Sequence, residues 1–232
     1  MKTSSEETNA IHAARHLIES AKCILFDFDG PICHLFAGYP ASEIADSLRD
    51  WLHERTPPTT ALPDSQDPQR LLTGVAELIS PRLFAELEQE LTRHELRATR
   101  TARATPGALP LIQQLAASGH GLAIATNNSR HAVEQYLRRE NLARPFGAHI
   151  HGRGQLPHEL KPHPSCLLHA LESTHTHPGA ALMIGDSDAD VAAANAAHVA
   201  FLGYAKDERR FLRLRNAGAT DVIRSLEPLS GG

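Results

Sequence analysis

The sequence predicts an α/β protein, a doubly wound parallel sheet that carries an inserted α-helical segment. Short apolar runs of strand length end in polar residues and alternate with segments of helical periodicity. That alternation predicts a parallel sheet with helices on both faces. It is interrupted once, by residues 34–104, where the periodicity is helical only. We therefore expect a core domain made of residues 1–33 and 105–232, and a helical cap domain made of residues 34–104.

The elements of the expected core follow one another as strands and helices of ordinary length. The apolar run Cys23–Phe26 is long enough for a buried strand, and Ser129 stands where a helix N-cap belongs. The other expected strands are 121–126, a weak one at 147–151, 180–185, 199–202 and 220–223. The expected helices are 8–20, 107–118, 130–140, 164–174, an alanine-rich one that ends near 197, and 206–217.

The expected insert contains three helices and a proline-rich loop. Apolar residues at helical spacing predict helices over 41–54, 68–79 and 81–103, with the loop at 56–67. Proline in the first turn of the second and third helices is at its preferred position. The segment Thr105-Pro106-Gly107 marks the return of the chain to the core.

Composition narrows the class of protein. Of 232 residues, 41% are hydrophobic and 22% charged, which indicates a packed core and not a disordered chain. A net charge of −4 gives no reason to expect nucleic acid or an anionic membrane as a partner, and no apolar run approaches the ~20 residues that span a bilayer. The polar start Met1–Ala10 is unlike a signal peptide, and three cysteines without metal-type spacing favour a reducing, cytoplasmic location.

Two carboxylates follow the first buried strand directly. Asp27 and Asp29 are separated by one residue, so in an extended backbone their side chains point the same way. Gly30 and Pro31 then break the strand. The pair is expected to project into the crevice at the carboxyl ends of the strands, where open α/β sheets bind ligands.

The other polar candidates stand at later strand ends and in one loop: Thr126 with Asn127, Lys161, and then Asp186 and Asp190. In a parallel sheet these ends share one edge. Several carboxylates gathered there need a counter-charge, which Lys161 and a divalent cation can supply. A set of oxygen ligands suits Mg²⁺, which usually also binds phosphate oxygens.

A phosphorylated ligand also fits the remaining polar groups. The hydroxyl of Thr126, the backbone N–H groups of residues 127–129 at a helix start, and Lys161 can all hold phosphate. One carboxylate of the Asp27 and Asp29 pair can then attack phosphorus, while the other transfers protons to and from the leaving oxygen and water. These residues together predict phosphoryl transfer through an aspartyl-phosphate.

Four motifs in order resemble the haloacid dehalogenase superfamily: Asp27-Phe28-Asp29-Gly30, the strand end at Thr126, Lys161 before Pro162, and Gly185-Asp186-Ser187-Asp188-Ala189-Asp190. The resemblance covers about residues 22–205, and phosphoglycolate phosphatase-like members, with a helical cap between the first and second motifs, look most similar. It implies a Rossmann-like core. In one respect the chain differs from the family's usual pattern, because Pro31 stands where Thr is usual.

The resemblance also implies a role for each site residue. Asp27 would be the nucleophile and a metal ligand, and Asp29 the general acid/base, with its backbone carbonyl on the metal. Thr126, Asn127 and Lys161 would hold phosphate. Asp186 would bind Mg²⁺, and Asp190 would support the metal directly or through water and orient Lys161.

The expected function is Mg²⁺-dependent hydrolysis of a small phosphorylated metabolite. Two alternatives stay open: a sugar-phosphate mutase that uses the same pair, and a binding or regulatory protein on a catalytically retired fold. A dehalogenase would not need Asp29, and a phosphonate-cleaving enzyme would need a cap lysine, which residues 34–105 lack. The sequence leaves the substrate and the oligomeric state open.

Overall fold

A computed structural model describes residues 2–154 and 159–230 of the chain. Its core is a six-stranded sheet in the order β5-β4-β1-β6-β7-β8, and every neighbouring pair is parallel. The strands are β1 (Cys23–Phe26), β4 (Gly121–Ala125), β5 (Ile150–His151), β6 (Ala181–Gly185), β7 (Ala200–Tyr204) and β8 (Asp221–Ile223). The predicted doubly wound parallel sheet is confirmed.

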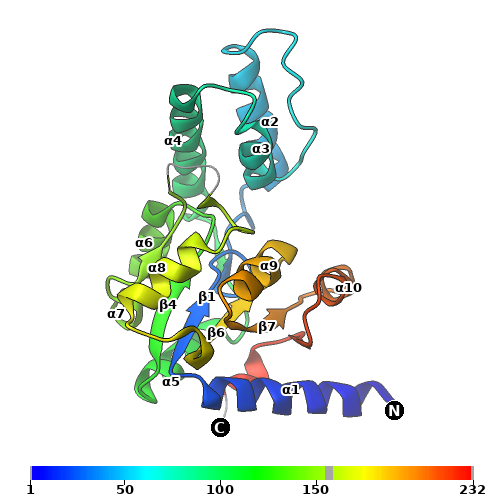
Figure 1. Ribbon diagram of the computed structural model, residues 1–232, viewed down its shortest axis with the longest axis vertical. Coiled ribbons are helices and arrows are strands. Elements are labelled where there is room, and N and C mark those ends of the chain that lie inside the picture. Colours follow the sequence, from blue (N-terminus) through cyan, green and yellow to red (C-terminus); the bar gives the residue numbers. More distant parts are fainter. Residues whose placement is uncertain (1, 155–158, 231–232) are drawn as a thin grey trace.

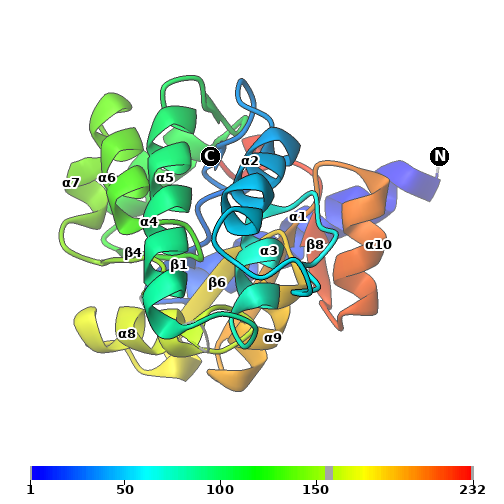
Figure 2. The same ribbon diagram turned by 90° about the horizontal axis from the view of Figure 1, so that it is seen from above.

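Both faces of the sheet are covered by helices (Figures 1 and 2). The helices of the core are α1 (Lys2–Ser20), α5 (Ala108–Ala117), α6 (Arg130–Arg139), α7 (Ala143–Phe146), α8 (Ser165–Ser173), α9 (Asp188–Ala196) and α10 (Glu208–Asn216), with short 3-10 turns η2 (Pro178–Ala180) and η3 (Glu227–Leu229). Among the described residues, no helix is both long and apolar enough to cross a lipid bilayer.

Alternate residues of the central strand pack into two different cores. Ile24 and Phe26 join the cluster that contains α1, α5 and α6, whereas Cys23 and Leu25 join the cluster that contains α8 and α9. This follows from the two-residue period of a strand, since neighbouring side chains point to opposite faces. A strand buried on both faces reads as a continuous apolar run, which is why the sequence shows Cys23–Phe26 as one block.

Three helices of the inserted segment stand above the sheet in Figure 1, and we call them the cap: α2 (Ala41–His53), α3 (Pro68–Val75) and α4 (Pro81–Ala98). They share an apolar core of their own, to which Leu48, Leu71 and Leu87 belong. Asp67 caps α3, because its side chain accepts hydrogen bonds from the backbone of Gln69 and Arg70. The helical character expected for this segment is confirmed.

The two ends of the cap meet in a short antiparallel pair that the sequence did not reveal. Strand β2 (Cys33–His34) pairs with β3 (Arg103–Ala104), so Cys33 lies opposite Ala104 and His34 opposite Arg103. Two-residue strands are too short to show an alternating pattern. The pair lies at the expected ends of the insert, and the division into a core domain (1–33 and 105–232) and a cap domain (34–104) stays a prediction.

Several predicted boundaries need correction. The third cap helix ends at Ala98 and not near 103, because the chain turns there to enter β3. The second cap helix ends at Val75 instead of 79, and α1 begins at Lys2 instead of Thr8. The strand expected at 147–151 is limited to β5 and follows the short helix α7, which was not predicted. Helix ends are the least certain part of a prediction because the last turns depend on tertiary contacts.

Candidate active site

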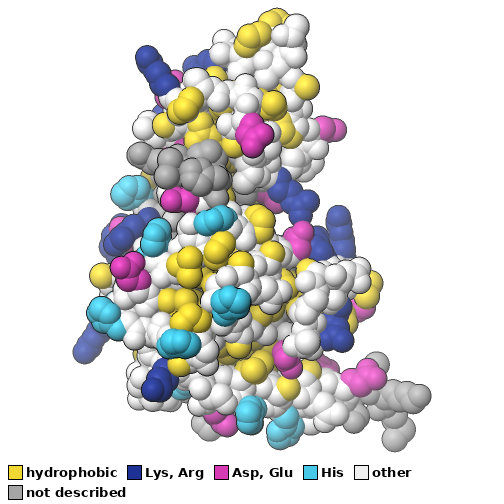
Figure 3. Space-filling view, viewed as in Figure 1, with side chains coloured by type: hydrophobic (Ala, Val, Ile, Leu, Met, Phe, Trp, Pro, Cys, Tyr) yellow, Lys and Arg dark blue, Asp and Glu magenta, His cyan; other side chains and the backbone are white. Residues whose placement is uncertain are grey.

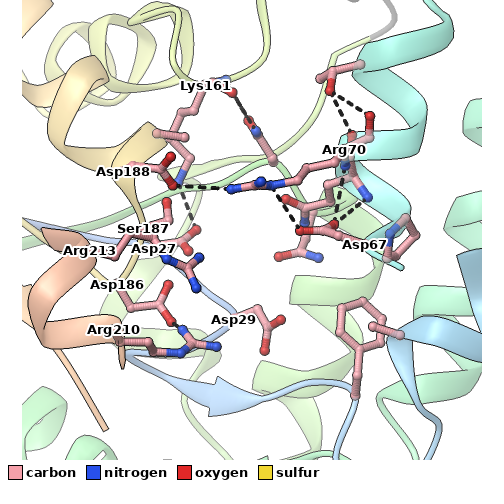
Figure 4. Close-up of a pocket in the computed structure, with 18 of the residues that line it drawn as sticks. Asp27, Asp29, Asp67, Arg70, Lys161, Asp186, Ser187, Asp188, Arg210 and Arg213 are labelled. Carbon is pink, nitrogen blue, oxygen red and sulfur yellow. Dashed lines mark hydrogen bonds and ion pairs between the residues drawn. The ribbon is translucent and has the colours of Figure 1, made fainter. Parts of the chain in front are cut away.

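The carboxyl ends of β1, β4 and β6 open into a cavity of about 930 Å³ between the core and the cap. Asp27, Asp29, Asn127, Lys161 and Asp186 all line it. Figure 4 shows the side chains of Asp27, Asp29, Lys161 and Asp186 directed toward one another from separate elements. The sheet therefore brings these predicted site residues together at one edge, as the topology requires.

Lys161 is the central cation of the site. Its Nζ donates to Asp27 Oδ1 at 2.9 Å, to Asp190 Oδ1 at 2.5 Å and to the carbonyl oxygen of Ala125 at 3.0 Å. Burial works against the charged amine, but the carboxylates of Asp190 and Asp27 outweigh it and raise the pKa of Lys161. Lys161 is therefore a permanent positive charge beside Asp27.

Asp27 is almost completely buried, with 8% of its surface exposed. Burial raises the pKa of its carboxyl, and Lys161 acts in the opposite direction because it favours the charged form. The lysine occupies only one carboxylate oxygen, Oδ1. The other oxygen can therefore serve as a nucleophile or a metal ligand.

The carboxylate of Asp190 is occupied by protein donors. Its Oδ2 accepts from the backbone N–H of Asp186 at 3.1 Å, the backbone N–H of Ser187 at 3.0 Å and the Ser187 hydroxyl at 2.6 Å, while Oδ1 accepts from Lys161. With Ser187 as N-cap it forms the capping box of α9. These contacts hold Lys161 in place. They favour the role of orienting Lys161, which is one of the two roles that the resemblance implies for Asp190.

Asp29 is in a different environment from Asp27. Its Oδ1 accepts a hydrogen bond from the backbone N–H of Leu35 at 2.8 Å. Burial raises its pKa to about 7, assisted by the nearby charge of Asp27 and opposed by the bond from Leu35. A carboxyl group with this pKa exchanges a proton near neutral pH, which is what a general acid/base requires.

A divalent cation fits the carboxylates of this edge. Oxygens of Asp27, Asp186 and Asp190 lie within 4.8 Å of one another, and such an all-oxygen set suits Mg²⁺. Asp186 Oδ2 is buried and receives no hydrogen bond from the described residues. Its only charged partner among them is Arg210, with which it forms an ion pair. The side chain of Asp29 does not belong to this group of three.

Gly30 lets the Asp186 carboxylate approach the backbone that follows Asp29. Its φ is +120°, and a Cβ there would stand 2.3 Å from Asp186 Oδ2. The next residue, Pro31, lies in a turn closed by Gly30 N–H donating to Cys33 O at 2.7 Å. The hydroxyl of Thr105 donates to Gly30 O at 2.5 Å, so the return segment of the cap holds this turn.

The loop after β4 differs from the expected phosphate cradle. Thr126 Oγ1 accepts from the backbone N–H of Asn128 at 3.2 Å and donates to its side-chain oxygen at 3.1 Å. The backbone N–H of Ser129 donates to Glu95 at 2.9 Å. Two of the three expected N–H donors, those of residues 128 and 129, therefore have protein partners, and the N-cap residue Ser129 makes no capping bond through its side chain.

The side chain of Asn127 has a structural bond that the sequence did not indicate. Its Nδ2 donates to the carbonyl oxygen of Lys161 at 3.0 Å, and its Oδ1 accepts from the backbone N–H of Lys161 at 2.8 Å. Asn127 therefore holds the lysine loop against β4. A phosphate-binding role for Asn127 stays a prediction, as do the roles of Thr126 and Lys161.

Two further residues, Cys33 and His34, follow the Asp pair closely in the chain. Cys33 is fully buried, and burial raises its pKa well above the ordinary value, so the thiol is a core residue with little thiolate character. His34 is half-buried and lines the cavity. Its pKa is lowered by burial and by the charges of Lys206 and Arg210.

Most of the chain matches a known protein family. Residues 21–198 match the family described as haloacid dehalogenase-like hydrolase. The chain belongs to this family. The haloacid dehalogenase-like fold and the hydrolase class predicted from the four motifs are thereby confirmed.

Named relatives of this haloacid dehalogenase-like chain include two curated proteins. A phosphoglycolate phosphatase of Rhodospirillum rubrum is 30% identical over 195 residues, which is 77% of each chain. A phosphoglycolate phosphatase of Nitrosococcus oceani is 30% identical over 160 residues, which is 69% of this chain and 66% of that protein. The predicted similarity to phosphoglycolate phosphatases is therefore confirmed.

Solved structures share the fold at lower identity. A hydrolase from Pseudomonas syringae superposes with a TM-score of 0.69 at 20% identity, covering 89% of this chain and 95% of that one. A haloacid dehalogenase family hydrolase from Deinococcus radiodurans, solved with bound phosphate and sodium, has a TM-score of 0.60 at 24% identity, with coverage of 90% and 93%. These likenesses support the fold.

Proposed function

We propose that this hydrolase is a Mg²⁺-dependent phosphatase that cleaves a small phosphomonoester through an aspartyl-phosphate. The observation that carries the proposal is the difference between two neighbouring carboxyl groups. Asp27 is paired with a permanent cation, Lys161. Asp29 lies apart from that lysine and has a pKa of about 7. Two carboxyls whose environments differ in this way are suited to two different roles, one nucleophile and one acid/base.

In the first step, a carboxylate oxygen of Asp27 forms a bond to phosphorus while the bond from phosphorus to the leaving oxygen breaks. Asp29, in its protonated form, gives its proton to that leaving oxygen, and the alcohol departs. Lys161 Nζ, held by Asp190, stays beside Asp27 and balances the negative charge that gathers on the transferring group.

In the second step, the carboxylate of Asp29 accepts a proton from a water molecule whose oxygen attacks the phosphorus. The bond between phosphorus and Asp27 breaks, which releases inorganic phosphate and regenerates the Asp27 carboxylate. The proton that Asp29 lost in the first step is thereby replaced. Mg²⁺, held by Asp27 and Asp186 and by the backbone carbonyl of Asp29, would neutralise charge on the phosphoryl oxygens.

The choice of substrate rests on the relatives. Two proteins that are 30% identical to this chain are named phosphoglycolate phosphatases. We therefore place 2-phosphoglycolate first among the small phosphorylated metabolites to be tested.

The three cysteines are all buried and free, which is consistent with a cytoplasmic protein.

A screen of phosphorylated metabolites with Mg²⁺ tests the proposal, with wild type compared against Asp27→Asn. We expect wild type to release inorganic phosphate from 2-phosphoglycolate or another monoester, and Asp27→Asn to lose this activity. Phosphoryl transfer to a second sugar, without release of phosphate, would indicate a mutase. Undiminished hydrolysis by Asp27→Asn would show that another residue is the nucleophile.

A further inference from the structure

One wall of the catalytic cavity is basic. Lys206, Arg210 and Arg213 line the cavity from α10 and the turn before it, and Arg70 lines it from α3 of the cap. Arg210 and Arg213 are three residues apart, so they project from the same side of α10. Figure 4 shows Arg70, Arg210 and Arg213 directed toward the space that Asp27 and Asp29 share. Figure 3 shows Lys and Arg side chains gathered on the side of the molecule where α10 lies below the cap.

Two of these four cations have acidic partners. The guanidinium of Arg70 lies 3.8 Å from Asp67 and 3.6 Å from Asp188, and it thus joins the cap to the start of α9. Arg210 is ion-paired with Asp186. These two positive charges are therefore already balanced within the protein.

The other two cations are Lys206 and Arg213. Among the residues that the structure describes, no acidic group lies within 4.0 Å of either one, and neither side chain makes a hydrogen bond. Arg213 is half-buried, which keeps its charge partly out of water. The field of Lys206 reaches across the cavity, because burial and the charges of Lys206 and Arg210 together lower the pKa of His34 on β2. Two uncompensated cations facing a catalytic cavity are typical of a site that binds an anion.

This basic wall is distinct from the group that would hold the scissile phosphate. Lys161, the cation of that group, is engaged by Asp27 and Asp190 and is almost completely buried. A volume of about 930 Å³ is near the upper end of the ~300–1,000 Å³ found for small-molecule sites. The cavity thus has room for a second anionic group beyond the phosphate at Asp27.

We propose that Lys206 and Arg213 form a second anion subsite, and that the substrate is a phosphomonoester which carries a further anionic group. This inference rests on the proposed phosphatase function and narrows its substrate class. A carboxylate and a second phosphate are both such groups. Arginine can bind either with two parallel hydrogen bonds, and lysine adds a point charge.

Matched substrate pairs test the subsite. The first pair is 3-phosphoglycerate and glycerol 3-phosphate, which differ in one carboxylate, and the second is fructose 1,6-bisphosphate and fructose 6-phosphate, which differ in one phosphate. We expect wild type to prefer, in at least one pair, the member with the additional anionic group by about tenfold or more in kcat/KM. The pair that shows the preference identifies the anionic group.

Variants assign the preference to residues. Arg213→Gln and Lys206→Gln are expected to reduce it about tenfold, mainly through KM, and Arg213→Lys to keep part of it because the charge remains. Arg209→Gln is the matched control, since Arg209 is an exposed arginine of the same helix that does not line the cavity. It is expected to leave the preference unchanged. Equal losses on both members of a pair, or a wild type without preference, would overturn the subsite.

Calorimetric titration separates this inference from the proposed function. If no phosphomonoester is hydrolysed in an Asp27-dependent way, the phosphatase proposal fails, and the subsite is then judged by binding. Tighter binding of 3-phosphoglycerate or fructose 1,6-bisphosphate than of the partner compound without the additional anionic group, lost in Arg213→Gln, would still support it. Equal binding within both pairs, or no binding at all, would overturn it.

Discussion

Arg153 and Glu95 form a buried, two-pronged ion pair that joins the cap to the core. Arg153 Nη1 lies 3.0 Å from Glu95 Oε1, and Arg153 Nη2 lies 3.1 Å from Glu95 Oε2, with both side chains completely buried. Glu95 also accepts from the Asn128 side chain at 2.9 Å and from the backbone N–H of Ser129 at 2.9 Å. Arg153 Nη1 donates to the carbonyl oxygen of Asn127 at 2.8 Å. The C-terminal part of α4 is therefore bonded directly to the loop after β4.

Removing one member of this pair is expected to destabilise the protein strongly. Arg153→Met leaves the Glu95 carboxylate buried without its cation, which should lower the free energy of unfolding by about 3–5 kcal/mol in urea denaturation. The matched control is Arg130→Gln, which removes the partly exposed pair with Glu134 and should cost at most about 1 kcal/mol. Equal effects of the two changes would contradict a special role for the buried pair.

The double variant Arg153→Met with Glu95→Gln should recover part of that loss, because no unpaired charge stays buried. If the double variant is as unstable as the sum of the single ones, the two residues do not act as a pair.

Asp29→Asn is expected to reduce kcat by about 10²–10⁴, because the amide can neither give a proton to the leaving oxygen nor take one from water. Its side chain lies outside the group of carboxylates that fits a cation, so binding of Mg²⁺ should be retained. Steady-state kinetics and a Mg²⁺ titration followed by thermal unfolding measure the two effects. An unchanged kcat would remove Asp29 from the mechanism.

Mg²⁺ should stabilise the folded chain and support turnover. A concentration one hundred times the dissociation constant stabilises by about 2.7 kcal/mol, seen as a rise in Tm, and chelation should abolish both the rise and the activity. Asp186→Asn should lose the rise, because it removes a carboxylate of the buried group. Asp188→Asn, in the same turn but half-exposed and paired with Arg70, is the control that should keep it. A persistent rise in Asp186→Asn would exclude Asp186 as a ligand.

His151 should make stability depend on pH. Burial, together with the charges of His169, Arg130 and His149, lowers its pKa from 6.5 to about 4 in the folded chain. Below pH 6.5 the unfolded chain therefore takes up a proton that the folded chain resists, so stability falls as the pH drops from 6.5 to about 4 and this contribution then levels off. The hydroxyl of Ser173 lies 2.7 Å from His151 Nε2.

The test is urea denaturation of wild type and His151→Asn at several pH values. The variant should show a smaller loss of stability across that window, whereas His12→Asn, a change on α1 far from β5 in the chain, should not differ from wild type. Parallel curves for wild type and His151→Asn would contradict the prediction.

Much of the fold, and most of the residues that line the candidate site, could be predicted from local patterns in the sequence. Cys23–Phe26 is apolar because a central parallel strand is buried on both faces, and Asp27 and Asp29, two residues apart just past its end, line the same cavity. The strand ends then share one edge through the parallel order of the sheet. These inferences need only the sequence, since periodicity and strand direction are properties of a local backbone.

Other features depend on packing between distant segments. Asp190 accepts hydrogen bonds from Ser187, Asp186 and Lys161, and only the folded α9 and the lysine loop bring these donors to it. Its expected support of the metal stays a prediction. No pattern in the sequence connects Glu95 with Arg153, because a helix of the cap and a loop of the core meet there.

The sequence by itself determined the parallel α/β core, the helical insert and the set of residues at the carboxyl edge of the sheet. Only the tertiary structure decided which oxygen faces which donor, that Asp29 has a pKa of about 7, and that Arg213 lines the same cavity as Asp27. The physical reason is that a side chain's charge state and partners depend on burial and on neighbours from other elements, which local spacing does not specify.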